Sequence, residues 1–443
     1  MATPAWPAWA RLFVRRLAGV DAIRNADPFV RQNYLHNFGV SLGDAVFYVF
    51  GLSFASTTVV LPLFLQNFTQ SRLALGLILG LIDAGVALPQ LFMVPFINRR
   101  SRQLPLVVGA SVVPRAMFLF IAVLMAFSTR LPAPVVVVGM LGLIALFGLT
   151  IGIVVGPWQE MIVKTVPALQ RGRFFGMRLT IAGLAGAVGA ALAGWMLGAL
   201  AFPINFAACL FITFASMMVS WGFLIFTREP TTPPRVTAAA PVLAHREGLA
   251  LMRRDPNFLR FITAYWLVTL GGMATGFYAV YATQRFAASN AQAGAYNAIW
   301  FMANVVSNAL WGWVNDRFGA KAVMVIGALA HIGALALALT ATSVEWLYLV
   351  FALASAASAA TLLASLTLPM VIGPEEERPL YIGLTNTLRA PVSVATSLLG
   401  GWLAQTYDYP VMFMSAAGLG LAGVVVLLWA VRVRSIGIGK PVS

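Results

Sequence analysis

The sequence is poor in the residues from which most catalytic and metal sites are built. Its one cysteine, Cys209, lies inside an apolar run, so neither a disulfide framework nor a cysteine-based metal site can be drawn. The three histidines, His36, His245 and His331, are scattered, and no Ser-His-Asp set is suggested. We therefore predict that the protein is not an enzyme and uses neither a cofactor nor a metal ion.

Charge is also scarce, at 10% of the residues, whereas a soluble domain carries roughly 25%. Hydrophobic residues make up 60% of the chain. They arrive in runs of about 20, the length that a helix needs to cross roughly 30 Å of hydrocarbon. Since lipid offers no partners to backbone polar groups, these runs must be helices. We predict an all-α integral membrane protein that has the lipid bilayer as its solvent.

Twelve such runs predict twelve transmembrane helices. They lie near 38–65, 74–98, 104–127, 133–157, 174–200, 203–227, 257–284, 292–314, 322–341, 346–372, 380–405 and 410–431. A long polar break, rich in proline and basic residues, separates the sixth run from the seventh. The predicted divisions are an N-terminal segment 1–33, an N-terminal six-helix bundle 34–227, a linker 228–256, a C-terminal six-helix bundle 257–431 and a tail 432–443.

Basic residues orient the chain, because Lys and Arg gather in the short loops on the cytoplasmic side of a membrane. With the N-terminus inside, that side holds 22 Lys and Arg, and the opposite side holds only Arg72, Arg130 and Arg285. Topology thus explains the formal charge of +15, and we expect no nucleic-acid partner. We predict a multi-pass protein of the cell (inner) membrane in which both termini, and the linker, are cytoplasmic.

The two halves resemble each other at a fixed offset of 207 residues, the separation of Pro167 from Pro374. The same offset pairs Arg171 with Arg378, Gly176 with Gly383, Gly194 with Gly401 and Trp195 with Trp402. A tryptophan beside a glycine at one offset is hard to attribute to chance. We infer a duplication that makes the two bundles pseudo-symmetric and places a substrate site near the midplane between them.

The loop after the eighth run carries a specific motif, Gly312-Trp313-Val314-Asn315-Asp316-Arg317-Phe318-Gly319-Ala320-Lys321. It resembles the signature loop of the major facilitator superfamily: glycine, three residues, Asp-Arg, one residue, glycine and then a basic position. In that family the loop latches the two halves together in one state. The resemblance implies a conformational latch of Gly312, Asp316, Arg317, Gly319 and Lys321.

The corresponding loop after the second run is degenerate. It keeps Arg99 and Arg102 but has Asn98 where the acid is expected. A latch made by Asn98, Arg99 and Arg102 is then weaker, or another acid such as Glu160 takes over. Alternatively, these arginines only anchor the topology.

The resemblance implies a secondary active transporter that moves a small organic solute by alternating access, as a monomer, with export slightly favoured over uptake. Whether protons drive this transport is left open. No phosphate-binding glycine loop is present, so ATP is not the direct energy source. The alternatives are a transporter of a lipid-like substrate and a non-transporting receptor of the same fold.

Ionisable residues inside a membrane are costly and are therefore functional candidates. At about 1.5 Å per helical residue, Asp83, Arg115 and Arg389 lie near the midplane, and Asp44 and Arg178 lie closer to the cytoplasmic face. We predict that Asp83, or second Asp44, binds and releases a proton during transport. The alternative is a static ion pair, such as Asp83 with Arg115.

Each of the three arginines inside the spans has a predicted role. Arg389 is predicted to be a countercharge for an anionic substrate or a gate partner of Asp44 or Asp83, and the alternative is a hydrogen bond to backbone carbonyls. The resemblance places Arg178 at the cavity or at the interface between the halves. Arg115, on an outer helix, is expected to reach a carboxylate.

A polar and aromatic stripe follows one face of the eighth run, with helical spacing. Its members are Asn297, Trp300, Asn304, Asn308 and Trp311. We predict contact with the substrate, or else hydrogen bonds between helices. Aromatic candidates are Tyr48, one turn beyond Asp44, and Tyr265, Trp266 and Tyr278 in the seventh run.

Two further patterns have mainly structural readings. His331, in the ninth run on an outer helix, is expected to be a packed, hydrogen-bonded, neutral histidine, with proton shuttling as the lesser alternative. Small residues recur every four positions in the fifth run, at Gly186, Ala190, Gly194 and Gly198. They predict a face for close helix packing rather than for ligand contact.

Overall fold

A computed structural model describes residues 27–167, 170–233, 250–374 and 377–433. Most of the predicted N-terminal segment, linker and tail lies outside these residues. The described chain is helical and has no strand. Large apolar side chains face outward along its length, with Val138 70% and Trp429 87% exposed. Water would not tolerate such a surface but lipid does, which agrees with an all-α integral membrane protein.

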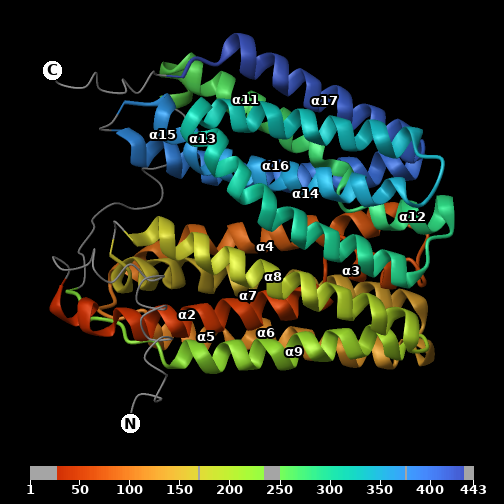
Figure 1. The fold of residues 1–443 in the computed structure, drawn as a ribbon, viewed down its shortest axis with the longest axis horizontal. Coiled ribbons are helices and arrows are strands. Elements are labelled where there is room, and N and C mark those ends of the chain that lie inside the picture. Colours follow the sequence, from red (N-terminus) through yellow and green to blue (C-terminus); the bar gives the residue numbers. More distant parts are fainter. Residues whose placement is uncertain (1–26, 168–169, 234–249, 375–376, 434–443) are drawn as a thin grey trace.

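The helices of the first half pack mainly with one another (Figure 1). They are α2 (Pro28–Phe54), α3 (Val60–Leu65), α4 (Arg72–Asn98), α5 (Leu104–Ala110), α6 (Val112–Ala126), α7 (Ala133–Thr165), α8 (Arg171–Ala199) and α9 (Ile204–Ile225). The second half contains α11 (Pro256–Gly271), α12 (Tyr278–Phe286), α13 (Asn290–Thr340), α14 (Trp346–Thr367), α15 (Pro369–Ile372), α16 (Arg378–Thr406) and α17 (Tyr409–Ala430).

Ten segments of the described chain are long and apolar enough to cross a membrane. One of them, α13, has 51 residues, more than twice the roughly 20 that a single crossing needs. Its chain turns at Gly319, where φ is 81° and ψ is 167°, a conformation that residues with a Cβ rarely adopt. Helix α13 therefore supplies two spans. Helix α16, with 29 residues, is long enough but more polar, so the fold is consistent with the twelve predicted spans.

The first helix of each half begins in the same way. Asp27 accepts hydrogen bonds from the backbone N–H groups of the first turn of α2, and Asp255 does so for α11. In both cases the aspartate precedes a proline, which lacks an N–H and fits the first turn of a helix. The shared start adds a structural likeness to the sequence repeat.

A second likeness ties the first helix of each half to the end of its last helix. Asn37 exchanges two hydrogen bonds with the backbone of Arg228, both 2.8 Å long. Asn257 exchanges two bonds of the same length with the backbone of Arg432. We call these the asparagine clamps. Asn37 lies ten residues after Asp27 and Asn257 only two after Asp255, so the clamps are alike in form but do not occupy equivalent positions of the repeat. The predicted domain boundaries stay a prediction.

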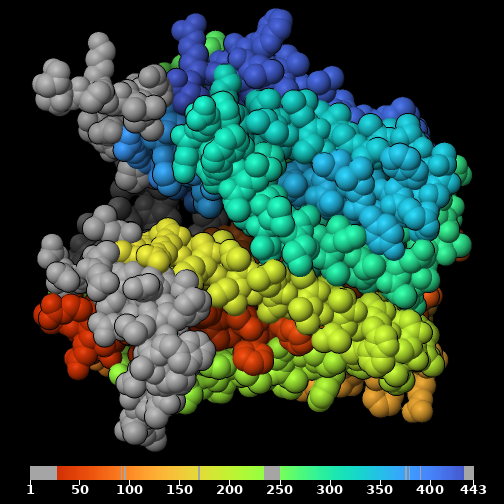
Figure 2. Space-filling model, in the orientation of Figure 1, coloured from red at the N-terminus to blue at the C-terminus, as the bar shows by residue number. Residues whose placement is uncertain are grey.

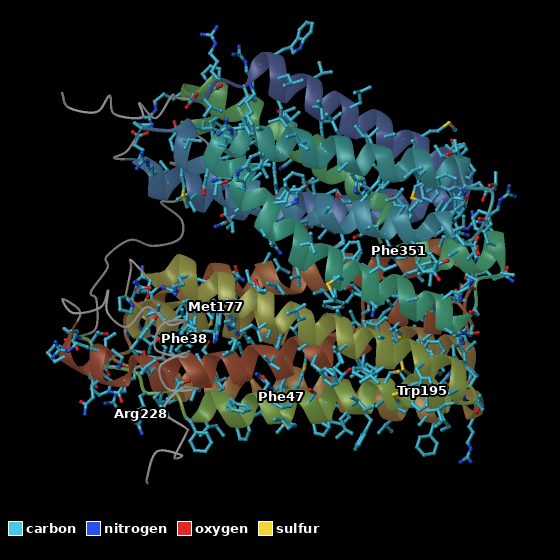
Figure 3. All side chains as sticks on the ribbon, viewed as in Figure 1. Phe38, Phe47, Met177, Trp195, Arg228 and Phe351 are labelled. Carbon is cyan, nitrogen blue, oxygen red and sulfur yellow. The ribbon has the colours of Figure 1, made fainter. Side chains whose placement is uncertain are left out.

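The two halves are joined by α8 against α13 and by α4 against α16. They separate toward the end of the molecule where α2 begins and α17 ends (Figure 1), and a hollow is visible between them there (Figure 2). Arg228 lies at this open end and Trp195 at the opposite, closed end (Figure 3). Under the predicted topology the open end is cytoplasmic, and that orientation stays a prediction.

Small residues bring the halves together toward the closed end. A Cβ on Gly194 of α8 would lie only 2.6 Å from the Cα of Gly294 in α13. A Cβ on Gly401 of α16 would lie 2.8 Å from the Cα of Leu73 in α4. The expected packing face on the fifth span is confirmed, since Gly186 and Gly198 also meet α13.

An ion pair closes the same end. The Arg72 guanidinium of α4 lies 2.8 Å from the Asp408 carboxylate, beyond the end of α16, and also donates to the Ala404 carbonyl. The Arg72 backbone N–H donates to the Gln405 side chain at 2.7 Å. Asp408 holds this position with φ at 132°, a strained value for a residue with a Cβ. The halves are thus linked by charge as well as by packing.

Candidate functional site

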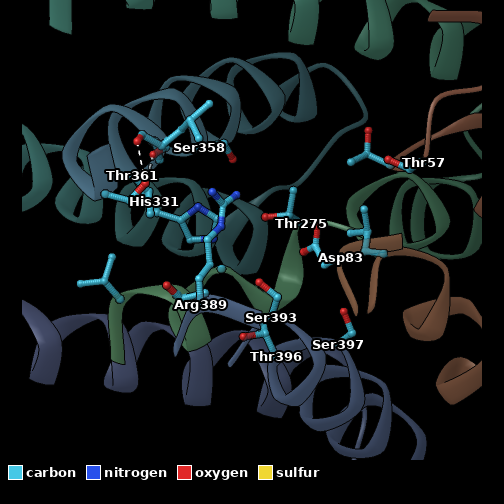
Figure 4. A pocket seen from close by; sticks show the side chains of 18 of the residues that line it. Thr57, Asp83, Thr275, His331, Ser358, Thr361, Arg389, Ser393, Thr396 and Ser397 are labelled. Atoms are coloured by element: carbon cyan, nitrogen blue, oxygen red, sulfur yellow. Dashed lines mark hydrogen bonds between the residues drawn. The ribbon is translucent and has the colours of Figure 1, made fainter. Parts of the chain in front are cut away.

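A cavity of about 480 Å³ lies between the two halves. Its walls come from the segment between α2 and α3, from α4, and from α11, α13, α14 and α16. Both halves therefore contribute to one binding surface, as Figure 4 shows for Asp83 of the first half and Arg389 of the second. The volume falls within the range of about 300–1,000 Å³ that small-molecule sites have.

Hydroxyl groups dominate the polar lining of this central cavity. Eleven of its residues are serine or threonine: Ser56, Thr57, Thr58, Thr269, Thr275, Ser358, Thr361, Ser365, Ser393, Thr396 and Ser397. Five of them donate to a carbonyl of their own helix and keep lone pairs that can accept from a ligand: Thr269, Ser358, Thr361, Ser365 and Thr396. Tyr265 and Trp300 add aromatic surface to the wall. The cavity can therefore bind a small molecule with many polar groups.

Two opposite charges face the cavity from opposite halves. Asp83 comes from α4 and accepts a hydrogen bond from the Ser393 hydroxyl of α16. Arg389, one turn before Ser393 on α16, points into the same space (Figure 4). No ion pair between Asp83 and Arg389 is found among the described residues. Both side chains are thus placed to meet a ligand.

The other three membrane charges gather in a second cavity, inside the first half. The Asp44 carboxylate lies 2.9 Å from the Arg178 guanidinium and 3.9 Å from the Arg115 guanidinium. The Ser220 hydroxyl also donates to Asp44, at 2.7 Å. The static pair of Asp83 with Arg115 is therefore wrong, because Arg115 on α6 faces α2 and α9 rather than α4. Its expected carboxylate partner exists and is Asp44.

The stripe on the eighth span divides between two roles. Trp300 lines the central cavity, whereas the Asn297 side chain donates to the Ser53 carbonyl of the other half at 2.8 Å. Asn308 donates to the side chain and backbone of Asn304, and Trp311 donates to the Ala356 carbonyl. Hydrogen bonding between helices thus accounts for Asn297 and Trp311.

The remaining aromatic candidates also divide. Tyr48 lies beside Arg115 in the second cavity, with the guanidinium 5.7 Å from its ring centre. Tyr265 lines the central cavity, whereas Tyr278 is fully buried and the Trp266 N–H donates to the Leu388 carbonyl. His331 lines the central cavity, and its Nε2 finds no partner in the described part of the chain. The expectation that His331 is hydrogen-bonded on an outer helix is thus not met at that nitrogen.

The predicted latch lies at the open end, where the halves are apart. Asp316 and Arg317 are exposed, and Lys321 donates to the Val431 carbonyl of its own half at 2.9 Å. Gly312 has room around it, and Gly319 makes the turn between the two spans of α13. The latch stays a prediction about a state in which this end is closed.

At the degenerate loop, Glu229 is an acid that the structure shows bound, while a latch role for Glu160 stays a prediction. The Glu229 carboxylate accepts hydrogen bonds from the backbone N–H groups of Gln103 and Leu104, at 2.7 to 2.9 Å. The Lys164 ammonium lies 3.5 Å away. Nearby, Arg102 donates to the Thr231 hydroxyl, while Arg99 is exposed and Asn98 ends α4. Glu229 thus joins the start of the linker to α5 and α7.

Replacing Glu229 with glutamine is expected to lower the free energy of unfolding by about 1.5–3 kcal/mol, the usual contribution of hydrogen bonds to a buried charge. Glutamine keeps the shape but leaves Lys164, whose side chain is only 9% exposed, without a counterion. The measurement is the melting temperature of the detergent-purified protein. Glu345→Gln is the matched control, because Glu345 is exposed. Equal melting temperatures for the two variants would contradict the role assigned to Glu229.

Sequence reasoning missed the hydroxyl lining, the position of His331 and the role of Glu229. A signal for the first existed, since Ser393, Thr396 and Ser397 share one face of the predicted eleventh span. Serine and threonine are common in membrane helices, however, where they bond to their own backbone, as Thr150, outside the cavity, does to the Leu146 carbonyl. Composition alone does not separate those from a cavity lining.

Comparisons with known proteins agree with this architecture. Two proteins described only as uncharacterized, from Mycobacterium bovis and Mycobacterium tuberculosis, are each 26% identical over 391 residues, which is 84% of this chain and 72% of theirs. A bacterial homologue of the lysosomal transporter Spinster, in an inward-facing and unoccupied conformation, aligns with a TM-score of 0.62 at 14% identity, over 91% of this chain and 95% of that one.

Two further solved structures share the fold. The nucleoside transporter NupG has a TM-score of 0.61 at 15% identity, over 88% of this chain and 98% of its own. A bacterial homologue of the iron transporter ferroportin, in an inward-facing state, has a TM-score of 0.66 at 13% identity, over 89% and 98%. The family model of the Major Facilitator Superfamily matches residues 45–283 and again 261–441. This chain therefore belongs to the Major Facilitator Superfamily and is a membrane transporter by family.

Proposed function

We propose that the protein is a secondary active transporter that moves a small, polar organic solute across the cell membrane by alternating access. One observation carries the proposal: the central cavity takes its acidic charge, Asp83, from one half and its basic charge, Arg389, from the other. When the halves move relative to each other, the distance between the two charges changes, and so do the contacts of a solute that binds both. Its binding energy can therefore favour one conformation over another.

The lining supports a polar solute. Eleven hydroxyl groups and two charges surround a space of about 480 Å³. A purely apolar ligand would strip water from the two charges and from the hydroxyls that do not already donate to their own helix, without replacing those hydrogen bonds. This costs about 1–3 kcal/mol for each group left unpaired. A solute with hydroxyl, amine or carboxylate groups restores those bonds. Such a solute is favoured over a lipid-like one in this cavity.

Coupling and direction belong to the same proposal. Asp83 is the proton-coupling residue, since it is the acid that faces the cavity, and Arg389 is its partner from the other half. The protein acts as a monomer with both termini in the cytoplasm, and export is favoured over uptake. A non-transporting receptor of this fold is the competing reading.

The proposal is tested by thermal-shift screening of the purified protein against sugars, amino acids, organic acids, nucleosides, lipids and cationic drugs, because a ligand of the folded state raises the melting temperature. We expect a cluster of related polar hits. Arg389→Gln should weaken an anionic hit by about 10- to 150-fold, since hydrogen bonds to charged groups contribute about 1.5–3 kcal/mol.

Arg130→Gln is the matched control, because Arg130 is exposed at the end of a short 3-10 helix, Ser128–Arg130, outside the cavity. Hits are then taken into proteoliposomes, in which uptake and release are measured under a proton gradient. Binding without movement across the membrane would favour the receptor. A cooperative melt that no polar compound shifts would contradict the proposed solute class.

A further inference from the structure

The second cavity, inside the first half, has a volume of about 300 Å³ and walls from α2, α6, α7, α8 and α9. It is separate from the central cavity and shares none of its lining residues. Its charged residues are Asp44, Arg115 and Arg178. The proposed transport cycle uses none of them.

The charges of this cavity do not balance. Two guanidinium groups share one carboxylate, because Asp44 is the only acidic residue in the lining. The lining residues from α7 and α9 are uncharged. The side chains are largely withdrawn from solvent, at 5% exposure for Arg115, 16% for Arg178 and 7% for Asp44. A buried positive charge without a counterion is expensive, so the site favours an added anion.

The two arginines differ in how much of their hydrogen-bonding capacity the protein uses. Arg115 donates through all three nitrogens, to the Met217 and Ser111 carbonyls and to the Ser220 hydroxyl. Arg178 donates to the Ser41 carbonyl through Nε and to Asp44 through one terminal nitrogen. Its other terminal nitrogen has no acceptor within the described residues. Arg178 therefore keeps donors available to a ligand.

Most of the remaining wall is apolar. Val49, Val155 and Leu179 are typical of the lining, and the Trp158 ring lies 4.7 Å from the Arg178 guanidinium. Leu179 lines the cavity and is also 56% exposed, so the cavity reaches the outside of the protein there. One turn further along α8, Gly183 meets Val305 of α13. The mouth thus lies where the two halves begin to separate.

We propose that this cavity binds an amphipathic organic monoanion of the alkyl carboxylate class. Its carboxylate pairs with Arg178, which presents two donors in one plane, the geometry that carboxylates prefer. Its hydrocarbon chain covers the apolar wall toward Leu179. The site is distinct from the central cavity, and the ligand bound there need not be the transported solute.

The test measures binding of decanoate, decanol and decylammonium to the full-length protein in nanodiscs of zwitterionic phosphatidylcholine. The three probes share one chain and differ in head-group charge. We expect decanoate to bind at least tenfold more tightly than the other two. Equal affinity for decanol would mean that the chain alone drives binding, and this result would overturn the proposal.

Substitutions in the second cavity test whether decanoate binds there. Arg178→Gln should weaken decanoate binding at least tenfold, and Leu179→Trp should block it by filling the cavity without changing any charge. Asp44→Asn should strengthen binding, because it removes the carboxylate that competes for Arg178. A purely structural cluster predicts lower melting temperatures in these variants but unchanged decanoate affinity.

Arg130→Gln, an exposed arginine far from the cavity, should leave decanoate binding as it is. If Asp44→Asn does not fold, Arg178→Gln and Leu179→Trp decide the outcome, and unchanged binding in both overturns the site. Loss of decanoate binding in Arg389→Gln, with binding retained in Arg178→Gln, would place the ligand in the central cavity and overturn it as well.

Discussion

Gly294→Ala is expected to abolish transport and to shift the protein toward a state that is open at the end closed in this structure. The added methyl group would overlap the backbone of Gly194, and the reverse contact is also too close, at 2.6 Å from a Cβ on Gly194 to the Gly294 Cα. Both neighbours are helix backbone and cannot rotate away. Overpacking of this kind costs about 1–3 kcal/mol, and because every 1.4 kcal/mol is about tenfold, it changes the conformational equilibrium by about 5- to 150-fold.

The shift can be measured as the distance between spin labels on cysteines placed at Ala201 and Thr342. Both positions are exposed in loops of opposite halves, and the native Cys209 is buried, so it does not compete for label. In the unmodified protein the two labels are close together when this end is closed. We expect the fraction of molecules with this short label-to-label distance to fall in Gly294→Ala. Gly222→Ala is the control, because no atom lies within 4 Å of its added Cβ. Unchanged distances together with normal transport would show that this contact does not control closure.

Asp83→Asn is expected to fold normally and to lose accumulation of solute against a gradient, so that the inside and outside concentrations become equal. Asparagine has nearly the same shape but cannot exchange a proton near neutral pH. Asp83 faces the central cavity and is not part of a buried ion pair, so its replacement should leave the melting temperature intact. Exchange of labelled for unlabelled solute should persist, because it needs no net proton movement.

The comparison uses proteoliposomes with a proton gradient for accumulation and without one for exchange. Glu345→Gln, at an exposed carboxylate outside the spans, is the matched control. Accumulation retained by Asp83→Asn would assign coupling to another group, and loss of folded protein would point to a structural role for Asp83.

The spans were predictable because hydropathy and length leave helices little choice in lipid. The partners of the buried charges were not. Asp44 and Asp83 lie on neighbouring helices of the chain, and either is within reach of an arginine by depth alone. Which one meets Arg115 depends on how each helix is rotated about its axis. That rotation is set by packing contacts, such as Gly85 of α4 against Gly148 of α7, and not by depth.

Glu229 shows a second limit to prediction from the sequence. The degenerate loop indicates that an acid is missing, and the sequence suggests Glu160 as one candidate to replace it. The group that binds this loop follows Gln103 by 126 residues and lies beyond the last span of the first half. Only the fold brings the end of α9 back beside the start of α5.

The asparagine clamps fasten the first helix of each half to the end of the sixth span of the same half. None of these four bonds crosses between the halves. A movement of one half against the other therefore breaks none of them, and the ends that the clamps join can move as one unit.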